Sequence, residues 1–467
     1  MLLTECRSSV VTDAPAERAV SDQEFAELMA PFEPVGPVAV GVSGGGDSVA
    51  LLRLLAPWAD RRGVPVTVLT VDHGLRPESA VEAEWAARLA GTLDLPHRTL
   101  RWEGAKPDAN RMAAAREARL SLLREVTAAL GSGAVLALAH TLDDQAETVL
   151  LNLARGSGVD GLSAMEARGA DGLTIRPLLS ISRERLRVTL RTLGQGWLED
   201  PSNEDRRYDR IKMRDALRQL APLGVTAERL AQTATAMRRA RAVLEAETLA
   251  LAQEAAELAP LGTIRLDAAR LAAAPDELAL RLLRLTLAEV SGAAYPPALA
   301  PLEALLAWVR SGAVEGRTLH GCRIVRSTRL GEAATVIVFR EPAAAERSGA
   351  VSADAATWDN RYRLISTWPD FDIARALGEE GAALLRQARR EGWQPGSTWD
   401  QAIAEQHRGA LSLWQRGCAG GTYRLVAVPD AGFGTSETDC WAKRYRKHRD
   451  AALVSTLSTK RGSSVPC

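Results

Sequence analysis

Several features that mark particular classes of protein are missing from this chain. Its 467 residues carry 58 basic and 58 acidic side chains, so the formal net charge is zero. The basic excess that accompanies many nucleic-acid-binding proteins is therefore absent. None of the five cysteines forms a CxxC pair, and a zinc ribbon or an iron–sulfur cluster would have no set of ligands. Any site for a polyanion must come from local clusters of basic residues.

Signals for secretion, membrane insertion and disorder are also lacking. No run of 18 apolar residues occurs, and the first twenty residues contain no basic segment followed by an apolar one. Aromatic residues make up only 4% of the chain, but the 46% hydrophobic and 25% charged residues are ordinary for a globular protein. We expect a cytoplasmic protein with no membrane association and about three domains.

Short apolar runs alternate with helical periodicity in the first part of the chain. Alternation of this kind predicts right-handed βαβ units and a Rossmann-like parallel sheet, in which ligands bind at the carboxyl ends of the strands. The predicted strands are Pro37–Val42, Val64–Val71, Leu95–Trp102 and Ala134–Ala139, and the predicted helices that follow the last three are Glu78–Leu93, Asp108–Leu130 and Leu142–Ala154.

Changes in composition divide the remainder of the chain. We predict an N-terminal extension over 1–34, an α/β domain over 35–220, a mainly helical domain over 221–341, a linker over 342–356 and a smaller α+β domain over 357–467. The Ala-rich segment before residue 357 has the low complexity typical of a linker. A basic run, Lys443 to Arg449, lies near the end of the chain.

A glycine-rich turn follows the first predicted strand and is the sharpest local signal. Successive backbone N–H groups in such a turn, together with the start of a helix, bind phosphate. The Walker lysine and the GxGxxG pattern are both missing. Asp47 is suited to holding Mg²⁺ between phosphates. The structural alternative is a tight turn with a helix cap, which does not need three glycines. The predicted nucleotide-binding residues are Ser43, Gly44, Gly45, Gly46, Asp47 and Ser48.

Polar residues also follow the second and fourth predicted strands. Asp72 and His73 would lie beside a nucleotide, and Arg76 could contact phosphate or substrate; an ordinary helix cap explains these residues equally well. His140 ends the fourth strand, and Asp144 and Glu147 are three residues apart on one helix face. Such carboxylates could bind an ammonium group, hold magnesium or accept a proton. The preference of acidic residues for helix N-termini is the alternative.

Two arginine clusters are candidates for contact with phosphate or RNA. Arg116 and Arg119 lie on one face of a predicted helix. Arginine at this density suits a phosphate backbone, and a solvated helix face with internal ion pairs is the alternative. The second cluster contains Arg206, Arg207, Arg210 and Arg214.

Taken in order, the motifs resemble those of the tRNA(Ile)-lysidine synthetase family of PP-loop ATP pyrophosphatases. They are SGGGDS, VDHGLR, AHTLDDQAETVLLNLARGSGVDGLSAM, RPLL and EDPSN, and the resemblance covers about Val38 to Arg214. It implies use of ATP and Mg²⁺, free L-lysine as a substrate, and a tRNA(Ile) with a CAU anticodon as partner. The C2 oxygen of the wobble cytidine would be adenylated, and lysine would then displace AMP. Asp47, His140, Asp144 and Glu147 are the predicted catalytic residues.

Two alternatives of different kinds stay open. Another PP-loop enzyme could thiolate cytidine or uridine in tRNA, although cytidine thiolases carry CxxC pairs that this chain lacks. A non-catalytic nucleotide- or RNA-binding protein could use the same sheet. Release of pyrophosphate from ATP, with and without tRNA and lysine, separates these hypotheses. Whether the protein forms a homodimer is also open.

Overall fold

The chain folds into two compact units, Met1–Arg241 and Ala242–Cys467. The structure is a computed structural model. It describes residues 17–34, 36–74, 78–103, 111–169, 171–199, 209–258, 263–293, 295–328 and 333–347, together with short strands between 351 and 424. In this described part of the chain, no helix has the length and apolar character that a membrane span requires.

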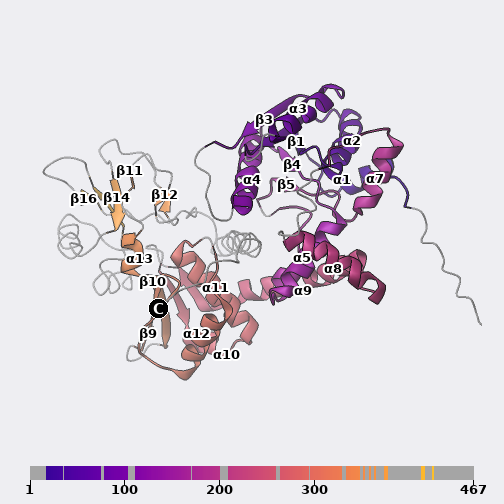
Figure 1. The fold of residues 1–467 in the computed structure, drawn as a ribbon. Coiled ribbons are helices and arrows are strands. Elements are labelled where there is room, and N and C mark those ends of the chain that lie inside the picture. Colours follow the sequence, from indigo (N-terminus) through magenta and orange to yellow (C-terminus); the bar gives the residue numbers. More distant parts are fainter. Residues whose placement is uncertain are drawn as a thin grey trace, which may run out of the picture. The chain divides into compact units, whose positions relative to one another are not determined.

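The first unit is built on a five-stranded parallel sheet (Figure 1). Its strands are β1 Val38–Gly41, β2 Val66–Asp72, β3 His97–Arg101, β4 Val135–Ala137 and β5 Thr174–Ile175. Their order is β3-β2-β1-β4-β5, and every neighbouring pair is parallel. This confirms the predicted Rossmann-like sheet. The strand order reverses between β1 and β4, the position where such sheets bind their ligands.

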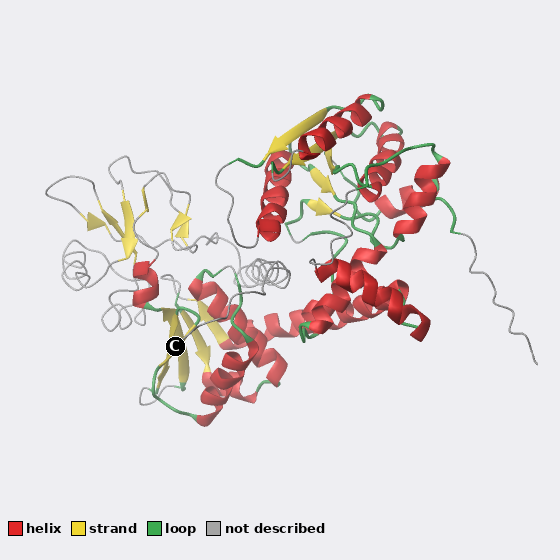
Figure 2. Ribbon diagram, in the orientation of Figure 1, coloured by secondary structure: helices red, strands yellow, loops and turns green. Residues whose placement is uncertain are grey.

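Helices cover both faces of this sheet (Figure 2). Val38 and Val40 of β1 pack toward α2 on one face, whereas Ala39 packs toward α4 on the other. Burial on both faces explains why β1, β2 and β4 are mostly apolar. The edge strand β3 has the sequence HRTLR and contains no fully buried residue. The helices of this unit up to residue 192 are α1 Asp22–Met29, α2 Gly46–Asp60, α3 Glu78–Gly91, α4 Arg111–Ala129, α5 Leu142–Ala154, α6 Val159–Leu162 and α7 Arg183–Thr192.

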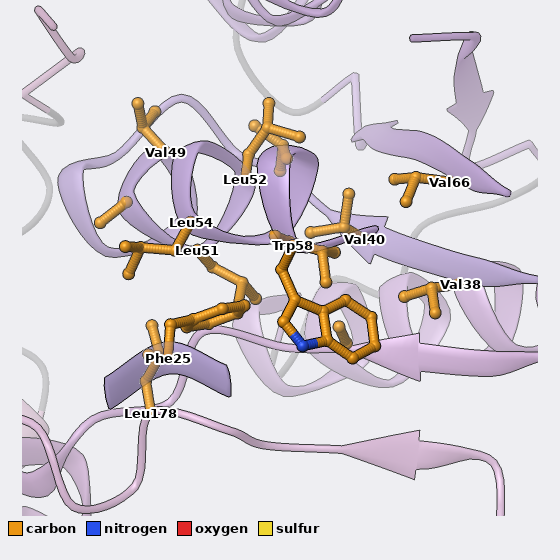
Figure 3. Packing of buried hydrophobic residues seen from close by; sticks show 14 of the residues in the cluster. Phe25, Val38, Val40, Val49, Leu51, Leu52, Leu54, Trp58, Val66 and Leu178 are labelled. Atoms are coloured by element: carbon orange, nitrogen blue, oxygen red, sulfur yellow. The ribbon is translucent and has the colours of Figure 1, made fainter. Parts of the chain in front are cut away.

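Among the elements that the structure adds to those predicted are α1 and the short strand β5. Phe25 and Met29 of α1 are completely buried, and Figure 3 shows Phe25 close to the side chains of α2. The segment predicted as an N-terminal extension thus contributes to the core. A helix of 8 residues offers only two turns of periodicity, and a strand of 2 residues offers no alternation, so neither stands out in the sequence.

Two later helices pack against the back of α5. They are α8 Asp209–Leu220 and α9 Ala227–Ala255, joined through a short 3₁₀ turn at Ala221–Leu223. Ala146, Val149 and Leu150 of α5 form an apolar cluster with Leu230 and Ala234 of α9. This packing leaves the opposite face of α5 for the start of α7.

Arginines of α9 hold the loop that follows α6. Arg238 donates to the carbonyl oxygen of Ser163 at 3.0 Å, and Arg241 donates to the hydroxyl of Ser163 and pairs with Glu166. Gln145 of α5 exchanges two hydrogen bonds with the backbone of Met165 in the same loop. The position of α5 is therefore set from several sides.

The second unit contains an antiparallel sheet of order β6-β7-β10-β9-β8. The segment 221–341 thus contains five strands in addition to its helices, and β6 and β7 interrupt an Ala- and Leu-rich sequence. The bounds predicted for a mainly helical domain stay a prediction. The strands are β6 Ala256–Leu258, β7 Ile264–Asp267, β8 Arg317–Leu319, β9 Cys322–Ser327 and β10 Thr335–Arg340, and the helices are α10 Ala268–Ala273, α11 Asp276–Ser291 and α12 Leu299–Ser311.

Beyond β10 the structure describes one helix and six short strands. The predicted boundaries of the linker and the C-terminal domain remain a prediction. The elements are α13 Pro342–Arg347, β11 Val351–Ser352, β12 Thr357–Trp358, β13 Tyr362–Arg363, β14 Ile373–Ala376, β15 Ser412–Gln415 and β16 Tyr423–Arg424, and the strand pairs are antiparallel.

Candidate active site

The glycine-rich turn between β1 and α2 forms a closed loop. We call its residues Ser43–Ser48 the P-loop, although the Walker lysine is missing. The backbone N–H of Ser43 donates to the Ser48 hydroxyl at 3.2 Å, and that hydroxyl donates to the Gly45 carbonyl oxygen at 2.8 Å. Gly44 has a φ of 86°, in the region that favours glycine. Gly45 precedes α2 without a side-chain cap, so the first N–H groups of the helix remain suited to an anion.

A segment that follows α7 lies against this loop. The backbone N–H of Leu198 donates to the Gly44 carbonyl oxygen at 2.9 Å. A side chain at Gly46 would meet the Trp197 indole at 3.4 Å, and one at Gly44 would meet Leu198 at 2.8 Å. We call residues 197–198 the strap. The glycines of the loop therefore have a packing role in addition to their suitability for phosphate.

Asp144 at the start of α5 has two distinct roles. Its Oδ2 atom accepts hydrogen bonds from the backbone N–H and the hydroxyl of Thr141, at 2.9 and 3.0 Å, which forms a capping box. Its Oδ1 atom instead faces Arg183 at 3.0 Å. The helix-cap explanation is correct for one oxygen of this carboxylate, and the other oxygen points toward the P-loop side.

Arg183, the first residue of α7, joins the predicted catalytic carboxylates. Its guanidinium lies 3.0 Å from Asp47, 3.0 Å from Asp144 and 3.3 Å from Glu147. Its backbone N–H donates to Asp143 at 2.7 Å. We call Asp47, Asp143, Asp144 and Glu147 the acid cluster. Residues separated by about a hundred positions in the chain thus meet beside the P-loop, between the ends of β1 and β4.

Sequence reasoning missed Arg183, although one signal was present. A cation in the first turn of a helix is unfavourable, because the helix dipole is positive there. An arginine directly after the capping serine of α7 therefore indicates that an external carboxylate is close.

The electrostatics of the acid cluster favour an ionised Arg183 and make Asp47 a weaker acid than usual. Burial raises the pKa of Asp47 to about 6; Arg183 opposes this rise, and Asp144 and Asp143 add to it. Burial by itself lowers the pKa of Arg183, but the attraction of Asp144, Asp47 and Glu147 outweighs it and raises that pKa above its ordinary value. Arg183 is therefore a permanent cation.

Glu147 is the most enclosed member of the acid cluster. Its side chain is 1% exposed, and its Oε1 atom accepts from Arg183 and, at 3.0 Å, from Arg214 of α8. Arg214 was predicted to contact RNA, and the structure places its guanidinium on a buried carboxylate. Arg206 and Arg207 lie outside the described residues, as does the side chain of Arg210 and the run Lys443 to Arg449.

The remaining predicted residues are spread around the same edge of the sheet. Asp72 ends β2, where the Ser79 hydroxyl and the Gly74 N–H donate to it at 2.6 and 2.9 Å. The Ser79 hydrogen bond is the main reason that the pKa of Asp72 is lowered. These bonds close the turn after β2, as the structural alternative requires. His73 and His140 are half-buried, and Arg76 lies outside the described residues.

Arg116 and Arg119 both lie on α4, as predicted. Arg116 is half-buried and Arg119 is exposed. Within the described residues the structure pairs neither with the acid cluster, so contact with phosphate or RNA stays a prediction for both.

A parallel sheet with a glycine-rich loop at its strand-order reversal, and with carboxylates on the helix that follows the adjacent strand, defines a nucleotide-binding α/β protein of the PP-loop class. A family model described as a PP-loop domain matches residues 18–221. Among curated relatives, the tRNA(Ile)-lysidine synthase of Ruegeria pomeroyi is 43% identical over 87% of this chain and 91% of its own length. That of Rhodopseudomonas palustris is 44% identical over 62% of this chain and 84% of its own length. The chain belongs to the tRNA(Ile)-lysidine synthase family.

Likeness to solved structures is weaker. The U34-tRNA thiolase NcsA from Methanococcus maripaludis matches with 18% identity and a TM-score of 0.40, over 46% of this chain and 77% of its own. This similarity is too low to support an argument about activity.

Proposed function

We propose that this chain joins free L-lysine to C2 of the wobble cytidine in a tRNA(Ile) with a CAU anticodon, at the expense of ATP. Membership of the family supports an ATP-dependent enzyme that modifies tRNA(Ile). The observation that carries the proposal within the structure is the acid cluster beside the P-loop. A phosphate-binding loop and a set of carboxylates suit the two reactants, one anionic and one cationic.

The reaction divides into two steps that balance. In the first, the C2 oxygen of the cytidine attacks the α-phosphorus of ATP, and pyrophosphate leaves. In the second, a lysine amine attacks C2, and the bond to the adenylated oxygen breaks to release AMP. Activation replaces a poor leaving group by a phosphate ester, which splits one difficult substitution into two easier ones.

We assign the phosphates of ATP to Ser43–Ser48 and one ammonium group of lysine to Asp144 and Glu147. The attacking amine must lose a proton, and we assign the role of acceptor to a carboxylate of the acid cluster or to His140. Asp72 and His73 would border the nucleotide from the end of β2. Asp47 belongs to the loop itself and pairs with the guanidinium of Arg183.

The protein alone offers few ligands for magnesium at this site. The described residues contain no group of three or more side chains that could hold a metal ion. Mg²⁺ in phosphate-transfer sites commonly uses one or two carboxylates together with substrate phosphates and water. We propose that Asp47 is such a carboxylate, and that the bound ion would neutralise charge on the phosphates.

Mass spectrometry of nucleosides tests the proposed function. Purified protein is incubated with unmodified tRNA(Ile), ATP, Mg²⁺ and lysine, and the digested tRNA is searched for cytidine that has gained lysine with loss of water. Omission of lysine and replacement of the CAU anticodon are the controls. Release of pyrophosphate with no lysine-containing nucleoside, or appearance of a thiolated nucleoside, would contradict the proposal.

A further inference from the structure

The contacts of Arg183 cover the carboxylate that is proposed to bind lysine. The Oε1 atom of Glu147 is shared by Arg183 and Arg214, and its Oε2 atom is buried without a hydrogen-bond partner in the described structure. With 1% of the side chain exposed, an incoming ammonium group reaches Glu147 only after one of the two guanidinium groups withdraws.

The charge of the acid cluster leaves room for a further cation. Four carboxylates face two guanidinium groups, so the sum is 2 − 4 = −2 when all are ionised. An entering ammonium group is therefore attracted, and the obstacle is steric. Arg183 competes for the same oxygen atoms as the ligand.

The backbone of Arg183 is fixed by hydrogen bonds, whereas its long side chain can change conformation. The backbone N–H is held by Asp143 at 2.7 Å, and Ser182 caps α7 by accepting from the N–H of Arg185. The guanidinium stands at the end of a flexible chain, between the P-loop residue Asp47 and α5. Phosphate oxygens at the P-loop would offer this guanidinium a planar, doubly hydrogen-bonded partner of higher charge than a carboxylate.

We propose that Arg183 is a positioning residue that covers Glu147 and Asp144 until nucleotide phosphates draw its guanidinium away, so that lysine binds after ATP. The inference rests on the proposed function, since lysine and ATP are the ligands that it orders. In this proposal Arg183 controls the access of lysine to Asp144 and Glu147 and does not contact the reacting atoms of lysine.

Calorimetric titration of lysine into the full-length protein, with and without Mg²⁺ and α,β-methylene ATP, tests this order. If Arg183 covers the carboxylates in nine of ten molecules, the analogue should tighten lysine binding about tenfold. In Arg183→Gln the lysine affinity should be the same with and without the analogue, and equal to that of the wild type with the analogue. Arg185→Gln is the matched control: Arg185 lies on the same helix as Arg183, and its two-point ion pair is with Glu24 of α1 and not with the acid cluster. It should keep the wild-type ratio.

Several outcomes would overturn the inference. The wild type could bind lysine equally well with and without the analogue, or fail to bind lysine in both conditions. Alternatively, Arg183→Gln could keep the wild-type ratio of the two lysine affinities. If Arg183→Gln fails to fold in a melting experiment, Arg183→Lys, which keeps the charge, should show a ratio between one and the wild-type value. Formation of the lysine-containing nucleoside without the predicted ratio would reject this inference alone, whereas its absence from the wild type would reject the proposed function.

Discussion

Asp144 and Glu147 lie one helical turn apart and make different contributions to the first unit. Asp144 has one oxygen in the capping box of α5 and one on Arg183. Glu147 lies beyond the first turn, and it forms ion pairs with two arginines. A substitution at Asp144 therefore changes the helix start and the acid cluster together, whereas one at Glu147 changes only the acid cluster.

We predict that Glu147→Gln and Asp144→Asn both retain ATP binding and raise the lysine KM. Loss of a charged hydrogen-bond acceptor should raise it by about 10- to 100-fold. Asp144→Asn should also lose about 0.3–1 kcal/mol of unfolding free energy, because a negative charge leaves the helix N-terminus. Steady-state lysine kinetics and a urea unfolding curve measure the two effects.

The exposed Glu184 of α7 provides a control, since Glu184→Gln removes an acid that pairs with Arg187 and Arg191 away from the acid cluster. Its lysine KM should not change. Full activity of both Asp144→Asn and Glu147→Gln, with only a small loss of stability, would show that the carboxylates serve the helix alone.

At the scale of elements, the P-loop and the strap have to be considered together. The loop contains adjacent glycines with different surroundings. Gly44 has a positive φ, and a Cβ atom added there would meet Leu198 at 2.8 Å. Gly45 has a φ of −69°, and an added Cβ atom would meet nothing nearer than the Ser43 hydroxyl at 3.7 Å. The sequence gives no means of distinguishing them.

We predict that Gly44→Ala lowers the free energy of unfolding by about 1–2 kcal/mol, the usual cost of a left-handed backbone at a non-glycine residue. Gly45→Ala should change it by less than about 1 kcal/mol, because its backbone is already allowed for alanine. Chemical denaturation of both variants compares them directly. Equal stability of the two variants would show that the strap and the loop adapt to a side chain at Gly44.

At the scale of the whole molecule, a zero net charge has to be reconciled with a tRNA substrate. The structure reduces the predicted basic patch, because Arg214 is committed to Glu147. Arg206, Arg207 and Arg210 remain as candidates for phosphate contact, and their role stays a prediction. Because the total charge is zero, attraction of the tRNA phosphates would have to come from local clusters of basic residues.

We predict that replacing Arg206, Arg207 and Arg210 together by glutamine reduces the slope of log affinity for tRNA against log salt. Each lost phosphate contact should contribute about 0.7–0.9 of a unit. A triple variant of Arg61, Arg88 and Arg270, exposed arginines that pair with acidic side chains, removes the same charge and should leave the slope unchanged. Filter binding at several salt concentrations measures both. Equal slopes for the two variants would reject a phosphate-contact role.

The sequence by itself determined the local features of this protein. Apolar runs separated by helical periodicity indicated β1, β2 and β4, because strands buried on both faces are mainly apolar. The edge strand β3, with the sequence HRTLR, gave a weaker signal. The motif SGGGDS and the residues from His140 to Glu147 were placed correctly at strand ends, because a glycine-rich turn and acidic helix starts have short-range causes. The same motifs indicated the family.

Only the tertiary structure decided which side chains meet. The local sequence around Arg183 does not predict its contact with Asp47, which lies 136 residues away. The contact exists because the strand order brings the end of β1 beside α5. The same holds for Arg214 on Glu147 and for the strap on Gly44. Contacts between distant segments depend on how whole elements pack, and that packing is a property of the folded chain as a unit.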